Sequence, residues 1–141
     1  MDSTRVPRFA FVGLAVSDVA ASVAFYRRLG VGFPEGAEGE PHVEGELPGG
    51  PLLVLDAEAT IRSFHPGWRP PSGGTRTALA FHCGSPAGVD ALYGELTGAG
   101  YHGELAPWDA FWGQRYAVVH DPDGNGVDLL APLQGSQGDT P

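Results

Sequence analysis

The chain has 141 residues, of which 42% are hydrophobic and 18% are charged. This length predicts one compact domain or two very small modules, and so much apolar surface excludes a disordered chain. Acidic residues outnumber basic ones 17 to 8, and the net charge is −9. This balance argues against a nucleic acid as partner, because phosphates are bound by cationic side chains. A neutral or cationic partner suits the chain better.

The single cysteine, Cys83, excludes an internal disulfide framework and a cysteine-rich zinc site. No apolar run approaches the ~18 residues typical of a membrane span. The sequence also lacks the basic-then-apolar pattern of a secretory leader. We therefore expect a cytoplasmic protein that does not bind membranes.

The first half of the chain predicts a strand, a helix and three further strands. Residues 9–16 form a short apolar run that is typical of a buried strand. Ser17 and Asp18 then supply a helix N-cap. The helix is expected over residues 19–29, with its apolar residues on one stripe and Gly30 ending it. The further strands are expected at 31–33, 42–47 and 51–56.

The second half repeats this pattern. It predicts a strand at 79–83, a helix at 89–99, and strands at 101–105, 115–120 and 127–131. Superimposing Val12 on Leu79 sets an offset of 67 residues, which also carries Leu14 onto Phe81. Apolar positions fall on apolar positions, so we infer an internal duplication.

We therefore predict an α+β fold of two repeated βαβββ modules, which form a cup-shaped mixed sheet with the helices on the outer face. Pro and Gly interrupt the segment between the modules, so no regular element is expected there. The expected parts are an N-terminal extension at 1–8, the first module at 9–56, a connector at 57–76, the second module at 77–133 and a flexible tail at 134–141.

Two stretches carry a resemblance to a known family. VGLAVSDVAASVAFYRRLG at 12–30 and WGQRYAVVHDPDGNGVDLL at 112–130 resemble the vicinal oxygen chelate superfamily. That superfamily includes glyoxalase I, extradiol dioxygenases, and fosfomycin- and bleomycin-resistance proteins. The resemblance covers about residues 9–131 and implies the same duplicated fold.

The resemblance also implies where a metal would be held. Enzymes of the superfamily bind a divalent metal in the cup, using His and Glu side chains from the first and last strands of each unit. Here those positions fall on Phe11, on Leu53 or Val54, on Ala78, and on Asp128. Only Asp128 offers an oxygen ligand, and one carboxylate cannot assemble a site that needs three or four ligands. We therefore expect no metal, no cofactor and no catalytic residue.

Among the members of the superfamily, the resemblance is then closest to the metal-free proteins of the bleomycin-resistance type. It implies a homodimer that sequesters a bulky, partly aromatic small molecule, such as an antibiotic, which is planar and neutral or cationic. Strand alternation directs Trp112, Gln114, Tyr116 and Val118 into the cup, and Trp68 is expected to act as a lid. The predicted ligand-binding residues are Phe11, Phe33, His42, Trp68, His82, Trp108, Phe111, Trp112, Gln114, Tyr116, Val118 and Asp128.

Two other functions stay open at this point. One is a lyase, isomerase or dioxygenase that uses a relocated metal or the acid/base residues His82, His120 and Asp128. The other is a ligand sensor with the same pocket and no role in resistance. Ordinary hydrogen-bonded histidines are the simpler interpretation of His82 and His120. Arg115 faces the helix side by alternation, so we expect it to form an ion pair there.

Overall fold

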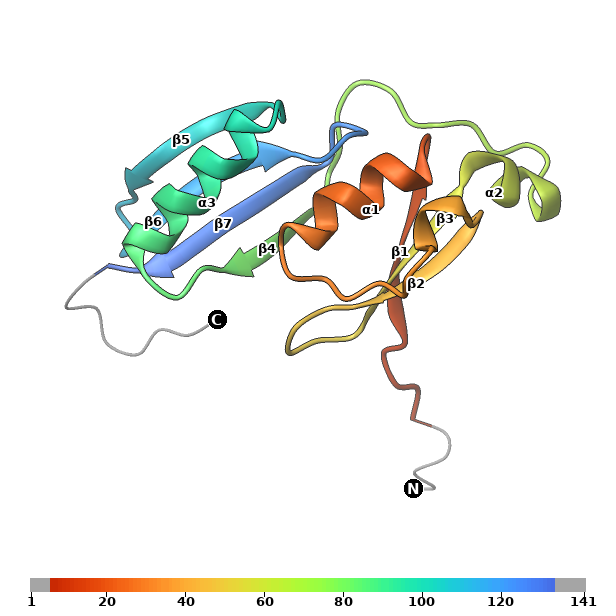
Figure 1. The fold of residues 1–141 in the computed structure, drawn as a ribbon, viewed down its shortest axis with the longest axis horizontal. Helices are drawn as coiled ribbons and strands as arrows, with labels where there is room; N and C mark the ends of the chain where they lie inside the picture. Colours follow the sequence, from red (N-terminus) through yellow and green to blue (C-terminus); the bar gives the residue numbers. More distant parts are fainter. Residues whose placement is uncertain (1–5, 134–141) are drawn as a thin grey trace. The chain divides into compact units, whose positions relative to one another are not determined.

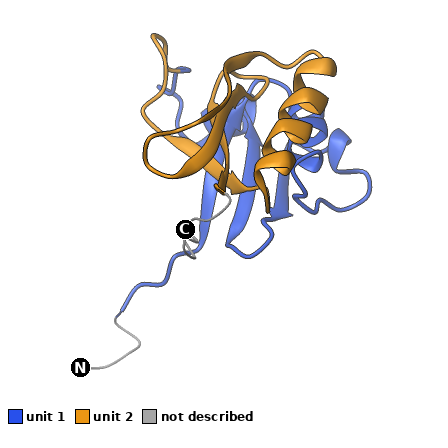
Figure 2. Ribbon diagram, turned by 90° about the vertical axis from the view of Figure 1, so that its left-hand side faces the viewer, with its two compact units in different colours: residues 1–70 blue, residues 71–141 orange. Residues whose placement is uncertain are grey.

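The structure is a computed structural model that describes residues 6–133. The chain divides into two compact units, residues 1–70 and residues 71–141 (Figure 2). This boundary falls inside the segment 57–76 that was expected to be the connector. The predicted tail at 134–141 and the first five residues of the predicted N-terminal extension lie outside the described residues. None of the helices within residues 6–133 is long and apolar enough to cross a bilayer.

The first unit contains a three-stranded sheet in the order β1-β3-β2 (Figure 1). β1 and β3 run parallel, and β2 runs antiparallel to β3. Asp18 caps the first helix as predicted, because its Oδ1 accepts the backbone N–H of Ala21 at 3.1 Å. The elements are β1 (Phe11–Val16), α1 (Val19–Arg27), the 3-10 helix η2 (Ala37–Gly39), β2 (His42–Glu46), β3 (Leu52–Ala57) and α2 (Glu58–Phe64).

Two predictions for this unit were wrong. Residues 31–33 do not form a strand but contribute a single isolated bridge between Gly32 and Glu46. The expected connector does contain a regular element, since α2 spans Glu58–Phe64. The prolines and glycines that were expected to prevent a helix begin only at Pro66, after α2 has ended.

The second unit contains a four-stranded sheet in the order β4-β7-β6-β5. β4 and β7 run parallel, and the other neighbours run antiparallel. The helix α3 lies across this sheet in Figure 1. The elements are β4 (Ala78–His82), α3 (Pro86–Gly98), β5 (Gly103–Asp109), β6 (Gln114–His120) and β7 (Gly126–Pro132).

The two units repeat one topology, which confirms the predicted α+β class. In each unit the first strand pairs in parallel with the last, and a helix lies between them in the chain. The register locates the equivalent positions, because Gly13 pairs with Val54 and Ala80 pairs with Asp128. Gly13 and Ala80 are 67 residues apart. Val54, rather than Leu53, is therefore the counterpart of Asp128.

Alternate residues of the second sheet are buried on the side of α3. Ala117 and Val119 of β6 and Leu129 of β7 are fully buried, as are Val89 and Leu96 of α3. Burying such an aliphatic side chain stabilises the fold by roughly 1.5–3 kcal/mol relative to leaving it exposed. This face of the sheet thus packs against α3 in the core, and the residues between those named lie on the other face.

Two glycines of α3 form a matched pair that tests this packing. A Cβ atom on Gly88 would lie 2.3 Å from the carbonyl oxygen of Cys83, whereas one on Gly94 would meet nothing within 4 Å. We expect Gly94→Ala to raise the free energy of unfolding by about 0.5–1 kcal/mol through helix propensity. Gly88→Ala should lower it by about 1–3 kcal/mol, because the backbone must shift. Urea unfolding measures both values, and equal stabilisation by the two substitutions would contradict the close approach.

Candidate functional site

The face of the second sheet opposite α3, called here the open face, carries most of the predicted ligand-binding residues. β6 contributes Gln114, Tyr116 and Val118 to it, because its register with β7 is unbroken and successive side chains of a strand point to opposite faces. β7 adds Asp128, which pairs with Val118 in the antiparallel register. Four residues predicted to bind the ligand therefore share one surface, as strand parity had indicated.

A pocket of about 340 Å³ lies on this face. Its polar lining includes the carboxylates of Asp128 and Glu104, the phenol of Tyr116 and the guanidinium of Arg76. Two carboxylates against one guanidinium favour a cationic or neutral ligand over an anionic one. The remaining lining residues are Thr75, Thr77, Ala78, Val118 and Gly126.

The Tyr116 hydroxyl donates a hydrogen bond to Asp128, and both residues line the pocket. Burial is the main cause that raises the pKa of Tyr116, to about 12, and the negative charge of Asp128 adds to it. Burial also raises the pKa of Asp128, against the effect of the Tyr116 hydroxyl, which lowers it. The phenol therefore stays protonated at neutral pH and remains a donor to the carboxylate.

Glu104 links this pocket to two histidines. Its Oε1 lies 2.6 Å from Nε2 of His120. The His120 ring in turn meets the His102 ring edge to face, with centroids 4.8 Å apart. His120 is thus a hydrogen-bonded histidine, which agrees with the simpler of the two interpretations given above.

His82 lies away from His120 along the sheet. His82 pairs with Leu130, whereas His120 pairs with Gly126. These positions on β7 are four residues apart, and four residues of a strand span about 13 Å. The Nδ1 atom of His82 accepts the backbone N–H of Gly84 at 3.2 Å. The considered acid/base site of His82, His120 and Asp128 therefore does not converge.

An aromatic cluster, made of Trp108, Phe111, Trp112 and Tyr116, extends the open face. The Trp112 ring meets each of the other three edge to face, with centroids 5.7, 4.9 and 5.2 Å away respectively. Its Nε1 donates to Oε1 of Gln114 at 2.9 Å, which fixes the indole. Phe111 is nevertheless 90% exposed, Trp112 47% and Trp108 37%. The cluster is an ordered aromatic surface that remains open to a ligand.

In the first unit, His42 lies on an acidic patch. Its Nδ1 is 2.6 Å from Oδ1 of Asp56, and its Nε2 is 3.3 Å from Oε2 of Glu44. These two carboxylates raise the pKa of His42, with Asp56 contributing most. His42 and Glu44 also line a pocket of about 440 Å³, together with Glu35 and Glu40.

The predicted residues Phe11 and Phe33 lie on opposite faces of the first sheet. Phe11 is 51% exposed. Phe33 packs on the buried side of Gly45, where an added Cβ would lie 2.6 Å from its ring. Because Gly45 and Glu44 are adjacent in β2, Phe33 lies on the face opposite Glu44 and His42. The structure thus does not place Phe33 with the acidic patch.

The expectation for Arg115 is confirmed. Its Nε lies 3.0 Å from Oδ1 of Asp90 in α3, and its Nη1 lies 3.0 Å from Oδ1 of Asp109.

Sequence reasoning did not select Glu104 or Arg76 as pocket residues. For Glu104 the reason is local, because register shifts in β5 interrupt the alternation by which faces are counted.

The positions that the resemblance assigns to metal ligands do not fit a metal. The side chains of Phe11, Val54 and Ala78 carry no donor atom, and Asp128 already accepts the hydroxyl of Tyr116. Within residues 6–133, no three His, Cys, Asp or Glu side chains form a group that could hold a metal ion.

Residues 8–129 match the family model described as Glyoxalase/Bleomycin resistance protein/Dioxygenase superfamily. None of the curated proteins matches the chain. Hypothetical protein SA1046 from S. aureus shares the fold, with a TM-score of 0.77 and 18% identity over 92% of this chain and 97% of that one. A glyoxalase/bleomycin resistance protein/dioxygenase from Nocardioides has a TM-score of 0.72 and 25% identity, covering 99% and 94%. A family enzyme of the same description from Burkholderia phytofirmans PsJN has a TM-score of 0.77 and 21% identity, covering 88% and 98%.

The two partners of His42 can be separated by titration. Asp56→Asn should lower the pKa of His42 more than Glu44→Gln does, because Asp56 is the nearer carboxylate. NMR titration of the imidazole signals measures both changes. The two ion pairs of His42 should stabilise the fold fully below the ordinary imidazole pKa. This stabilisation should disappear as the pH rises through the raised pKa that His42 has in the folded protein. Equal shifts in the two variants would contradict the arrangement.

The pKa of Asp128 should move in opposite directions in two variants. Tyr116→Phe removes a hydrogen bond to the ionised carboxylate, so the pKa should rise further. Glu104→Gln removes a neighbouring negative charge, so the pKa should fall. NMR titration of the labelled carboxyl carbons measures both, with Asp90 on the helix side as the control. A shift in the same direction in both variants would refute the described geometry.

Proposed function

We propose that this chain, which belongs to the Glyoxalase/Bleomycin resistance protein/Dioxygenase superfamily, binds and sequesters a bulky, planar, partly aromatic small molecule such as an antibiotic. The observation that carries the proposal is the aromatic cluster, which stands exposed beside the pocket of Tyr116 and Asp128. In this proposal the protein is a metal-independent homodimer of the cytoplasm.

The aromatic cluster supports a planar ligand. Trp112 is held by Gln114 and by three rings, so little side-chain freedom would be lost when a ligand stacks on it. Each aromatic pair contributes about 0.5–1.5 kcal/mol beyond the area it buries. Large aromatic side chains exposed together are also typical of binding sites rather than of inert surface.

The charges of the pocket support a neutral or cationic ligand. Asp128 and Glu104 offer carboxylate oxygens beside the aromatic cluster, where the amino group of an aromatic ligand could be bound. The net charge of −9 would also speed the approach of a cation. An anionic ligand would be repelled by both carboxylates, and Arg76 is the one cationic side chain among the described residues of this pocket that would attract it.

Binding without a metal is supported by the side chains at the family's ligand positions. Phe11, Val54 and Ala78 supply no oxygen or nitrogen, so Asp128 is left as a single donor. A resistance protein and a ligand sensor would use the same site in the same way. In either role, the pocket and the cluster together offer a broad surface for one ligand.

A lyase or isomerase that works by acid/base chemistry is the second candidate. The observation that favours it is the raised pKa of Asp128, together with the Glu104–His120 pair at 2.6 Å. A carboxyl group with a raised pKa is suited to proton transfer. Turnover of a bound molecule that is abolished in Asp128→Asn would indicate this function. Sequestration would instead leave the bound molecule chemically unchanged.

Binding can be tested with three planar probes that differ in charge. These are the cation 9-aminoacridine, neutral acridone and anionic anthracene-9-carboxylate, and fluorescence anisotropy reports their binding. We expect the cation to bind most tightly and the anion least tightly. Trp112→Ala should weaken the binding of the cation about tenfold, through lost stacking. Asp128→Asn should weaken the binding of the cation and leave the binding of acridone unchanged.

Phe64→Ala is the matched control, because Phe64 is an aromatic residue of the first unit that is 70% exposed. It should not change the binding of any probe. Equal losses in Phe64→Ala and Trp112→Ala would contradict the proposed site. Protein purified without chelators should also contain no stoichiometric divalent metal, and finding one would favour the enzyme instead.

A further inference from the structure

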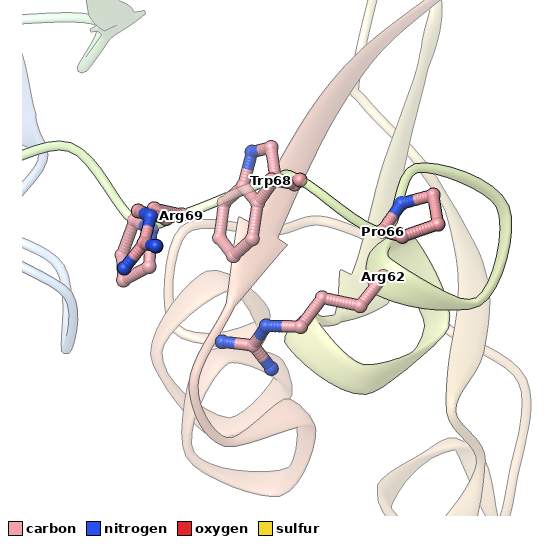
Figure 3. Close-up of a pocket in the computed structure, with 6 residues that line it drawn as sticks. Arg62, Pro66, Trp68 and Arg69 are labelled. Carbon is pink, nitrogen blue, oxygen red and sulfur yellow. The ribbon is translucent and has the colours of Figure 1, made fainter.

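A second pocket, called here the basic pocket, lies in the first unit where α2 passes into the following loop. Its volume is about 510 Å³. Figure 3 shows the side chains of Arg62, Trp68 and Arg69 along it. The lining residues are Arg62, Pro66, Gly67, Trp68, Arg69 and Pro70, so it has two guanidinium groups and no carboxylate.

Local backbone structure brings Arg62 and Trp68 together, and Arg69 follows directly in the chain. The backbone N–H of Trp68 donates to the carbonyl of His65 at 3.0 Å, which folds the loop back after α2. The indole of Trp68 then lies beside Arg62, whose Cζ is 5.5 Å from the ring centroid. Pro66 and Pro70 flank the loop and restrict its backbone. The guanidinium and the indole are thus held beside each other before any ligand arrives.

The charge of Arg62 is only weakly compensated. Its Nη2 lies 3.5 Å from Oε1 of Glu58, one turn earlier in α2. An exposed ion pair of this kind contributes little to stability. It also occupies only part of the guanidinium, which has five N–H donors. The other two pockets described above are both lined by carboxylates. In a chain with a net charge of −9, a pocket with two arginines and a tryptophan is a local reversal of sign.

We propose that the basic pocket is a binding site for a small aromatic anion, of the aromatic carboxylate class. The carboxylate would accept hydrogen bonds from Arg62 and Arg69, because the planar guanidinium matches both carboxylate oxygens. The ring of the ligand would pack against the indole of Trp68. This site takes the opposite charge from the ligand of the open face, so it is a second function that does not depend on the first.

The three tryptophans of the chain allow the basic pocket to be observed alone. In a Trp108→Phe, Trp112→Phe double variant, all indole fluorescence comes from Trp68. Benzoate, benzamide and benzylamine have the same ring and differ in charge. We expect benzoate to change the Trp68 fluorescence at a concentration at least tenfold lower than the other two require. Calorimetric titration of the unaltered protein with benzoate, whose charge disfavours the open face, gives a second readout.

Substitutions of single charges then identify the groups that bind. Arg62→Gln and Arg69→Gln should each weaken benzoate binding about tenfold, as expected for a lost charged hydrogen bond. Glu58→Gln should strengthen it about twofold, because it removes the competing carboxylate. Arg8→Gln is the matched control and should change nothing, since Arg8 does not line the pocket.

The proposal is overturned if benzamide binds as tightly as benzoate, or if neither compound binds. It is also overturned if Arg8→Gln weakens the binding of benzoate as much as Arg62→Gln does. The overall charge of the protein, rather than the pocket, would then explain the effect. The fluorescence results come from Trp68 alone, because the double variant has no other tryptophan, so binding at the open face does not contribute to them. Failure here is therefore distinct from failure of the proposed function.

Discussion

Within each unit, the structure depends on the parallel pairing of the first strand with the last. Parallel neighbours cannot be joined by a tight turn, so the chain between them crosses one face of the sheet and carries a helix there. In the second unit this seals one face with apolar residues and leaves the other open. The same pairing places Asp128 in an inner strand between Ala80 and Val118. The carboxylate of Asp128 lines the pocket beside Tyr116.

How far the site could be predicted depends on how regular each strand is. In β6 the register with β7 is unbroken, so counting residues correctly put Tyr116 on one face and Arg115 on the other. In β5 the register shifts between Gly103 and Leu105, and counting could not select Glu104. The pairing of Glu104 with His120 joins residues sixteen positions apart, and it follows from the β5–β6 register rather than from any local pattern.

The repeat predicted the topology but not its weakest elements. The segment 31–33 is reduced to one bridge, and Phe33 packs against Gly45, a contact set by the fold and not by local sequence. Helix α2 has seven residues and buries none of them, so it lacks the apolar stripe by which longer helices are predicted. That short helix nevertheless positions Arg62 beside Trp68. The chain thus combines an acidic aromatic surface in one unit with a basic aromatic pocket in the other.

The binding of aromatic ligands at the open face is tested most directly by the indole N–H signals in the NMR spectrum of isotope-labelled protein. The chain has three tryptophans, so three such signals are expected. On titration with 9-aminoacridine, we predict that the signals of Trp112 and Trp108 shift together while that of Trp68 stays in place. A titration that moves only the Trp68 signal, or none of the three, would contradict a ligand-binding surface on the second unit.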